Sequence, residues 1–157
     1  MKQVTWSHSA LKDYEGCPKR YQEVRVLKNY KFQETEQTKY GTELHKAAED
    51  YIKDGTPVPP QFAFMQKSLD TLKAKEGEKL CEYKMGLTRN LTPCGFFDKD
   101  VWWRGIADLI ILQEDKAYVV DYKTGKSAKY ADPKQLELLS LAIFKHFPKV
   151  KKVKGGL

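Results

Sequence analysis

Two apolar stretches decide the fold: residues 101–112 (VWWRGIADLIIL) and residues 117–125 (AYVVDYKTG). Each stretch is rich in Ile, Val and aromatic residues and is bounded by polar turn residues, which is typical of a β-strand. The link between them, residues 113–116 (QEDK), is short and polar. The sequence therefore predicts an antiparallel hairpin at the centre of the fold.

Each predicted strand carries one carboxylate in an otherwise apolar row. Because side chains alternate between the faces of a strand, we expect Asp108 to share a face with Ile110, and Asp121 with Lys123. Burying a lone charge is unfavourable unless a partner or a metal compensates it. Two acids and a lysine on neighbouring strands therefore predict a site for a divalent cation. Taken singly, an aspartate at a strand end more often caps a turn than serves in a site, and a lysine two residues later is often only a solvated side chain.

The pattern around these residues resembles a known family. Residues 105–108 (GIAD) followed by residues 119–125 (VVDYKTG) are similar to the core of the PD-(D/E)XK nucleases, in the form found in RecB-type and Cas4-like exonucleases. The resemblance implies a mixed α/β (α+β) fold with a restriction-endonuclease-like core. In that core a central mixed sheet is flanked by helices.

Other motifs of the family are matched in part. His45, four residues after Gly41, corresponds to a histidine that reaches the metal, although a lone histidine beside an apolar helix face is more often a core residue. Gln135 matches the glutamine that opens the Gln-x-x-x-Tyr motif, but Leu139 stands at the tyrosine position. The family often has an acid on its first strand, which makes Glu82 a candidate. From the residues alone Glu82 is a solvent-exposed side chain of an edge strand.

The resemblance implies a role for each of these residues. The expected metal ligands are His45, Asp108, Asp121 and the backbone carbonyl of Tyr122. The expected catalytic residues are Asp108, Asp121, Lys123, Glu82 and Gln135. Oxygen ligands suit Mg²⁺, while an imidazole shifts the preference towards Mn²⁺. The expected nucleic-acid contacts are Arg20, Lys126 and Lys129, with a packing ion pair as the alternative for Arg20.

The cysteines argue against an iron–sulfur cluster. Residues 17–21 (CPKRY) are similar to a Cys-Pro-x-Arg-Tyr signature of the same nucleases, in many of which this cysteine joins three others to bind such a cluster. The chain has only Cys81 and Cys94 besides Cys17, so one chain cannot supply four thiolates. We expect Cys17 to be a small buried residue. An odd, widely spaced set of cysteines also favours a reducing compartment.

The rest of the chain predicts a single domain over residues 1–157 with the element order α-α-α-β-β-β-α-β. The expected helices cover residues 7–16, 41–52, 61–75 and a segment that starts at 133, and further strands cover residues 80–88 and a segment that starts at 150. Residues 21–39 begin with a β-like alternation. In the strand at 80–88, Cys81, Tyr83, Met85 and Leu87 are expected on one inward face.

Charge and hydropathy limit the classes of function. The chain of 157 residues carries 28 Lys and Arg against 21 Asp and Glu, a net charge of +7, which suits a polyanionic partner such as DNA and equally a plain soluble surface. No apolar run is long enough to span a membrane, and no signal-peptide core is present, so we expect a protein of the cytoplasm, in a bacterium or a phage-infected host.

Three functions are consistent with these observations. The first is a metal-dependent DNA exonuclease, acting on single strands or duplex ends in DNA recombination, repair or degradation. The second is a structure-specific endonuclease or junction resolvase on the same core. The third, of another class, is a non-catalytic nucleic-acid-binding protein.

Overall fold

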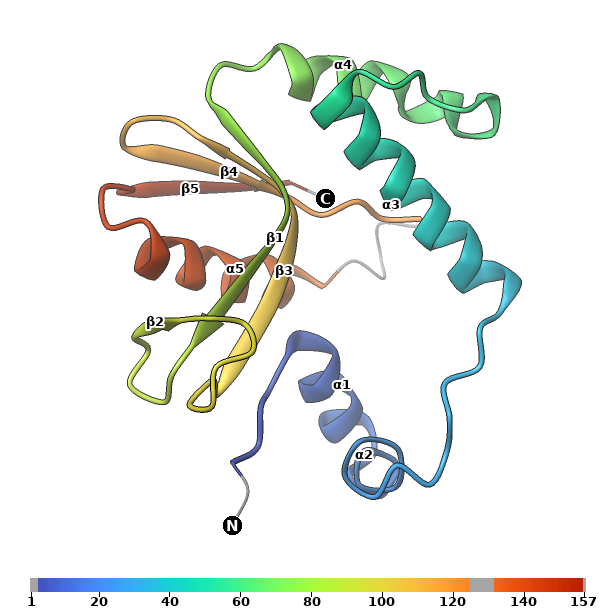
Figure 1. Cartoon of the computed structure of the whole chain (residues 1–157), viewed down its shortest axis with the longest axis vertical. Coiled ribbons are helices and arrows are strands. Elements are labelled where there is room, and N and C mark those ends of the chain that lie inside the picture. The colour runs from blue at the N-terminus through green and yellow to red at the C-terminus, as the bar shows by residue number, and fades with distance from the viewer. Residues whose placement is uncertain (1–2, 125–131, 157) are drawn as a thin grey trace.

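A five-stranded mixed sheet forms the centre of the structure, a computed structural model that describes residues 3–124 and 132–156 (Figure 1). Its strand order is β2-β1-β3-β4-β5; β4 and β5 are parallel, and the other neighbours are antiparallel. The strands are β1 (Glu78–Leu87), β2 (Pro93–Cys94), β3 (Trp103–Leu112), β4 (Lys116–Val120) and β5 (Lys152–Gly156). The predicted hairpin is confirmed as β3 and β4, joined by the short polar link.

Helices cover both faces of this sheet, with α3 and α4 on one side and α5 on the other (Figure 1). The α-helices are α1 (His8–Gly16), α2 (Pro18–Tyr21), α3 (Glu36–Asp54), α4 (Gln66–Ala74) and α5 (Pro133–His146). A π-helical segment (Gln22–Val26) follows α2, and a 3₁₀ helix (Pro60–Met65) precedes α4. The predicted α/β fold and the order of its main elements are confirmed, with the four-residue α2 and the two-residue β2 as additions.

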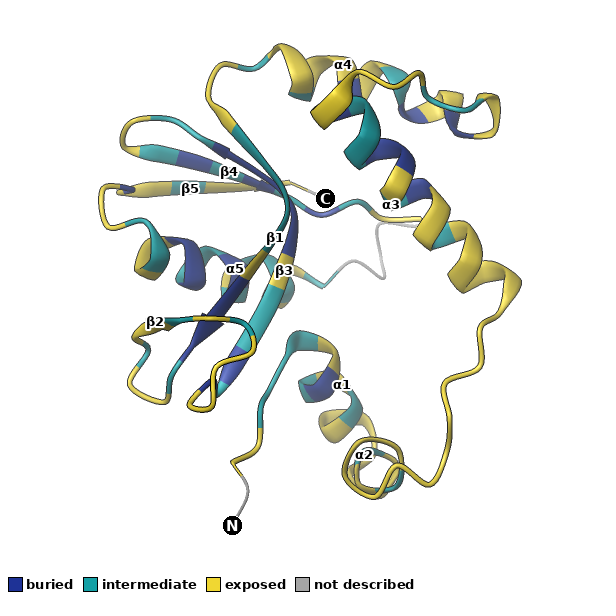
Figure 2. Cartoon of the chain, in the orientation of Figure 1, coloured by how far each residue is buried: buried dark blue, intermediate teal, exposed yellow. Residues whose placement is uncertain are grey.

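The core has two parts, one on each face of the sheet (Figure 2). On the α5 side, Leu139 and Ile143 pack against the buried side chains of Ile110 and Val119. On the other side, residues of α3 and α4 pack against Leu109 and Ile111, and this cluster includes Leu44, Ala48, Phe62 and Leu69. Because residues on both sides of His45 in α3 are anchored in the core, this helix is fixed against the sheet.

Side-chain alternation breaks where β1 and β3 face each other. Cys81 and Leu109 are paired and both pack on the α3 side, whereas the next recorded pair, Tyr83 and Ala107, packs on the α5 side. Between them, Glu82 has a left-handed backbone with φ of 47°. This conformation is uncommon for a residue other than glycine, and it reverses the faces of the strand.

Two predictions about strand faces are therefore wrong. Asp108 reaches His45 on α3, while Ile110 packs on the α5 side, so the two side chains do not share a face. Cys81 likewise does not share a face with Tyr83. In β1 the cause is the left-handed backbone of Glu82, which the polar–apolar pattern does not reveal, and β3 changes face at the position opposite it, between Ala107 and Leu109. The reversal brings Glu82 and Asp108 to the same point of the sheet.

Two predictions near the N-terminal helices are also wrong. Residues 22–26 form a π-helical segment instead of a β-like stretch, because the helical backbone continues directly from α2. Cys17 is exposed and not buried. Its Sγ accepts a hydrogen bond from the backbone N–H of Arg20, at 3.4 Å, so Cys17 caps α2 instead of packing in the core.

Helix starts also differ from expectation. The helix expected from residue 41 begins at Glu36, because Thr35 and Thr38 cap each other's backbone N–H groups in a capping box. The helix expected over residues 61–75 is divided into the 3₁₀ helix and α4. By contrast, the helices expected over residues 7–16 and from residue 133 begin close to the predicted positions, where Ser7 caps α1 and Pro133 occupies the first turn of α5.

Candidate metal centre

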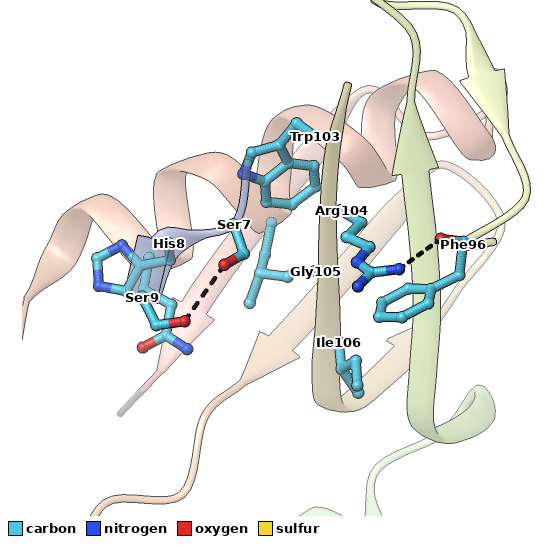
Figure 3. Close-up of a pocket in the computed structure, with 10 residues that line it drawn as sticks. Ser7, His8, Ser9, Phe96, Trp103, Arg104, Gly105 and Ile106 are labelled. Atoms are coloured by element: carbon cyan, nitrogen blue, oxygen red, sulfur yellow. Dashed lines mark hydrogen bonds between the residues drawn. The ribbon is translucent and has the colours of Figure 1, made fainter. Parts of the chain in front are cut away.

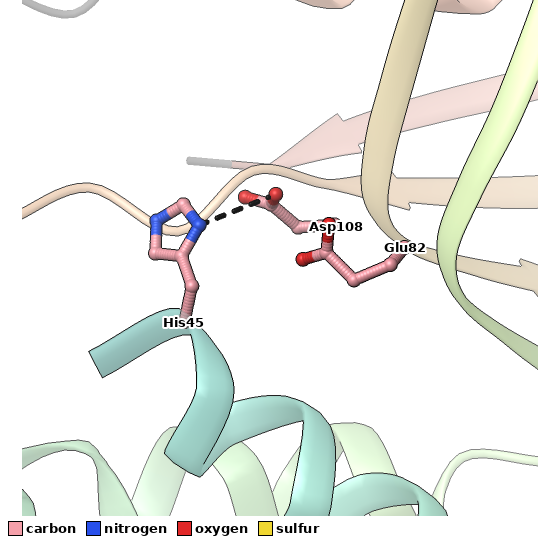
Figure 4. A group of neighbouring side chains, drawn as sticks. All are labelled: His45, Glu82 and Asp108. Carbon is pink, nitrogen blue, oxygen red and sulfur yellow. Dashed lines mark ion pairs between the residues drawn. The ribbon is translucent and has the colours of Figure 1, made fainter. Parts of the chain in front are cut away.

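Three potential metal ligands meet between α3 and the sheet (Figure 4). His45 comes from α3, Glu82 from β1 and Asp108 from β3. Their ligand atoms all lie within 4.8 Å of one another. The reversal at Glu82 is the local feature that directs both carboxylates to this point.

Both ring nitrogens of His45 face acceptors. Nε2 lies 2.8 Å from the carbonyl oxygen of Tyr122, and Nδ1 lies 3.5 Å from Oδ1 of Asp108. The hydrogen bond and charge of Asp108 raise the pKa of His45 to about 9, although burial acts in the opposite direction. In the metal-free state at neutral pH the imidazole is therefore protonated and donates from both nitrogens. The Tyr122 carbonyl, predicted as a metal ligand, lies at the site with one lone pair already used by His45.

Asp108 is almost completely buried, with 7% of its surface exposed. Its Oδ2 accepts a hydrogen bond of 2.8 Å from the backbone N–H of Tyr122. Burial alone would raise the pKa of Asp108, but the hydrogen bond and charge of His45, together with this N–H, hold it below its ordinary value. Asp108 is therefore ionised and held by two elements at once.

Asp121 follows directly after β4 and is 4% exposed. Its carboxylate forms an ion pair with Lys123, and its backbone N–H donates to the Gly156 carbonyl oxygen at 3.0 Å. Burial raises the pKa of Asp121 to about 6, the neighbouring Asp108 adds to this shift, and Lys123 opposes it. Asp121 and Asp108 therefore lie side by side, and the positive charge of Lys123 compensates only part of their negative charge.

Lys123 and Gln135 extend the site towards α5. The Nζ atom of Lys123 donates to Oε1 of Gln135 at 2.8 Å, in addition to its ion pair with Asp121. The structure thus brings together five of the predicted side chains, from Gln135 through Lys123 and Asp121 to Asp108 and His45. They come from positions far apart in the sequence.

Glu82 is half-buried beside Asp108 and does not lie free in solvent, as the residue pattern alone suggested. Burial, and then the charge of Asp108, raise the pKa of its carboxyl group. The pKa values of Glu82 and Asp121 are thus both raised, mainly by burial and further by the charge of Asp108, and a bound cation would oppose both effects.

The predicted nucleic-acid contacts are not part of this cluster. Arg20 is exposed on α2, and its side chain forms no hydrogen bond or ion pair with the residues that the structure describes, so the packing alternative has no support there. Lys126 and Lys129 lie outside the described residues.

A cavity of about 370 Å³ adjoins the site (Figure 3). Gln135 lines it, together with Ser7, Phe96 and Arg104. The sequence analysis did not single out Arg104, which lies four residues before Asp108 on β3. The two-residue period of a strand was the available signal, because it places both side chains on one face.

The donor set fits a divalent cation. An imidazole and two carboxylates are ordinary ligands for such ions. The ligand atoms of His45, Glu82 and Asp108 lie within 4.8 Å of one another, close enough for one ion to be held between them after small side-chain movements. Asp121 lies beside Asp108 but is not one of these three residues.

Fold and site together define a class of protein. A mixed sheet with an acid on β3, an acid and a lysine directly after β4 and a histidine from α3 is the arrangement of a metal-dependent nuclease. The sequence profile of the PD-(D/E)XK nuclease superfamily matches residues 5–156, and the chain belongs to this superfamily. Membership indicates a nucleic-acid substrate.

Further comparisons add nothing to this assignment. No curated protein and no solved structure matches the chain. Within the described parts of the chain, no helix has the length and apolar character needed to cross a membrane.

Proposed function

We propose that this protein is a metal-dependent DNA exonuclease that hydrolyses phosphodiester bonds from DNA ends, in recombination, repair or degradation. The observation that carries the proposal is the continuous set of contacts from His45 through Asp108 and Asp121 to Lys123. The set combines side chains that can bind a divalent metal ion with the positively charged Lys123, which is fixed beside them.

The side chains divide the chemistry between them. His45, Glu82, Asp108 and Asp121 would hold Mg²⁺ or Mn²⁺, which when bound lowers the pKa of a water molecule and neutralises charge on the phosphate. Lys123, held between Asp121 and Gln135, orients the attacking water and stabilises the negative charge that develops on the phosphoryl oxygens. Gln135 is a positioning residue, because it fixes the ammonium group through its side-chain oxygen.

The choice of an exonuclease rests on the resemblance to RecB-type and Cas4-like enzymes. It is carried by residues 105–108, residues 119–125, His45 and Gln135. Contacts to phosphates carry no sequence information, so selectivity must come from the shape of the substrate. A free DNA end that reaches the metal centre is the simplest such shape.

The test compares end-labelled linear and closed circular single-stranded DNA, each with Mn²⁺, with Mg²⁺ and with a chelator. We expect release of nucleotides or short oligomers from linear DNA with either metal, falling steeply as salt rises, and no attack on circles. The Asp121→Ala variant, purified in parallel, controls for contaminating nucleases. Circles cut as fast as linear strands would replace the exonuclease by the endonuclease alternative. Binding without cleavage at any metal concentration would favour the non-catalytic alternative.

A further inference from the structure

A row of side chains leads away from the metal centre along the same face of the sheet. On β3, Trp103 and Ala107 pack on the α5 side, so the alternating residues Arg104, Ile106 and Asp108 face the other way. Ile106 is 37% exposed, so this part of the face is open. Four residues of strand, at about 3.3 Å each, separate Arg104 from Asp108 by about 13 Å.

The neighbouring strand carries a second cation on this face. Lys84 is paired with Ile106 in the register of β1 and β3, and it lies two residues after Glu82. It is exposed to solvent. The two cations Lys84 and Arg104 therefore lie on adjacent strands, on the side of the metal centre that points away from α4.

Two phenyl rings lie over these cations. Phe96 and Phe97, in the connection between β2 and β3, have ring centres 5.0 Å apart and planes inclined at 74°. The guanidinium carbon of Arg104 lies 4.5 Å from the Phe96 ring centre, and its Nη1 donates to the Phe96 carbonyl oxygen (Figure 3). Lys84 Nζ lies 5.5 Å from the Phe97 ring centre.

The outer ring and both charges remain available to a ligand. Phe97 is 76% exposed, an unusual position for a phenylalanine. Neither Lys84 nor Arg104 forms an ion pair with a carboxylate in residues 3–124 and 132–156. An exposed aromatic face beside unpaired cations is the arrangement that binds unpaired bases by stacking and phosphates by charge.

We infer that Phe96, Phe97, Lys84 and Arg104 form a stacking platform that binds a single-stranded segment of the substrate. A stacked strand advances about 3.4 Å per nucleotide, and the platform extends from Lys84, about 7 Å from Glu82, to Arg104, about 13 Å from Asp108, so it holds the strand about two to four nucleotides from the bond that is cut. Single-stranded nucleic acid is the ligand because the faces of paired bases are covered in a duplex. The inference rests on the proposed function, since it assigns the substrate strand of that same site.

The first test measures binding of the metal-free protein, in chelator, to a fluorescently labelled single-stranded oligonucleotide by anisotropy. Phe97→Ala should weaken binding by about 5- to 100-fold, the usual effect of removing one stacking partner, and Phe97→Trp should restore it. Phe144→Ala is the matched control, because Phe144 is a partly exposed phenylalanine on α5, which covers the other face of the sheet. Equal affinities for wild type and Phe97→Ala would overturn the inference.

The second test concerns the cations. Lys84→Gln should lower the slope of log affinity against log salt by about 0.7, the value for one phosphate contact of a single strand, while Lys67→Gln, an exposed lysine of α4, should leave it unchanged. Tighter binding of a blunt duplex than of a single strand would also overturn the inference.

These outcomes separate the inference from the proposed function. Binding in chelator does not require cleavage. A protein that never cuts DNA but loses affinity on Phe97→Ala would contradict the exonuclease alone. A protein that cuts from ends but binds equally well without the Phe97 ring would contradict the platform alone.

Discussion

His45 holds a proton that a metal ion has to displace. Its pKa is raised to about 9, mainly by Asp108, so the metal-free imidazole is charged at neutral pH. Metal binding must release this proton, and the apparent affinity for Mn²⁺ should therefore rise with pH, by up to about tenfold per unit between pH 7 and 8.5. Isothermal titration calorimetry measures it. His45→Gln should bind more weakly and with a flatter pH profile; a steep profile retained in His45→Gln would contradict the role of this imidazole.

Asp121 should destabilise the metal-free fold once it ionises. Its pKa of about 6 in the folded protein lies above the ordinary value of 3.8. The protonated carboxyl group therefore adds to the unfolding free energy in full below about pH 4, and this contribution is lost as the pH rises through about 6. Above pH 6, Asp121→Asn should therefore have a higher melting temperature than wild type, because its unfolding free energy is larger by at most about 3 kcal/mol. At pH 4 the two proteins should have the same melting temperature. The variant should also lose most of the thermal stabilisation that Mn²⁺ gives to wild type.

Thermal melts at pH 4, 6 and 8, with and without Mn²⁺, measure both effects. A metal-free melting temperature of Asp121→Asn clearly below that of wild type at pH 8 would contradict the charge repulsion between Asp121 and Asp108.

Removing single side chains should abolish cleavage. Asp108→Ala and Asp121→Ala each remove a proposed metal ligand, and Lys123→Ala removes the cation proposed to stabilise the developing charge, so each should reduce the cleavage rate at least about 100-fold. Initial rates on linear DNA measure the loss. Glu114→Ala, an exposed acid in the turn between β3 and β4, is the control and should cleave at the wild-type rate. Full activity in either Asp variant would contradict the site.

At the level of elements, Gly105 lets β3 lie close to its neighbours. A Cβ atom there would lie 2.7 Å from the Trp103 ring and 3.2 Å from a methyl group of Leu139 on α5. Gly105→Ala should therefore lower the unfolding free energy by about 1–3 kcal/mol. Chemical denaturation measures it, with Gly16→Ala as control, since a Cβ at Gly16 meets nothing within 4 Å. A Gly105→Ala variant as stable as wild type would show that the Trp103 ring moves aside easily.

Elements with strong local signals were predictable from the sequence, and those fixed by other parts of the chain were not. The β3–β4 hairpin and α5 were predicted because each consists of apolar segments bounded by polar turn residues or proline. The left-handed backbone of Glu82 leaves no local signal, because a glutamate in a strand looks the same whichever way its backbone turns. The predicted face of Cys81 was wrong for this reason, and that of Asp108 was wrong because β3 changes face opposite Glu82. The early start of α3 depends on reciprocal caps between two threonines, which the apolar period ignores.

At the scale of the whole molecule, the site depends on contacts between distant residues. The spacing of Asp108, Asp121 and Lys123 predicted a cation site, because these residues lie on adjacent strands. His45, Glu82 and Gln135 were reached only through the family resemblance. The sequence alone does not tell which helix face or strand position meets the acids. The platform around Phe97 was missed because its four residues come from two strands and a connection.

The purified protein should contain no iron–sulfur cluster. Its three cysteines lie at the start of α2, in β1 and in β2, and one chain cannot supply four thiolates. We therefore expect a colourless protein with no absorption band near ~400 nm, the region typical of such clusters. Spectroscopy of protein purified without oxygen, together with an iron assay, measures this. A band with stoichiometric iron would show that Cys17 takes part in a cluster shared between chains.

Asp121 takes its backbone support from β5, through the hydrogen bond of its N–H to Gly156. A ribosome reaches Gly156 35 residues after Asp121 (156 − 121), which takes roughly 2–7 s at about 5–20 residues per second. During that interval the nascent chain already contains His45, Glu82, Asp108 and Asp121, but it lacks the strand that fixes the last of them. The strand that supports the backbone of Asp121 is therefore added only after all four of these side chains have been made.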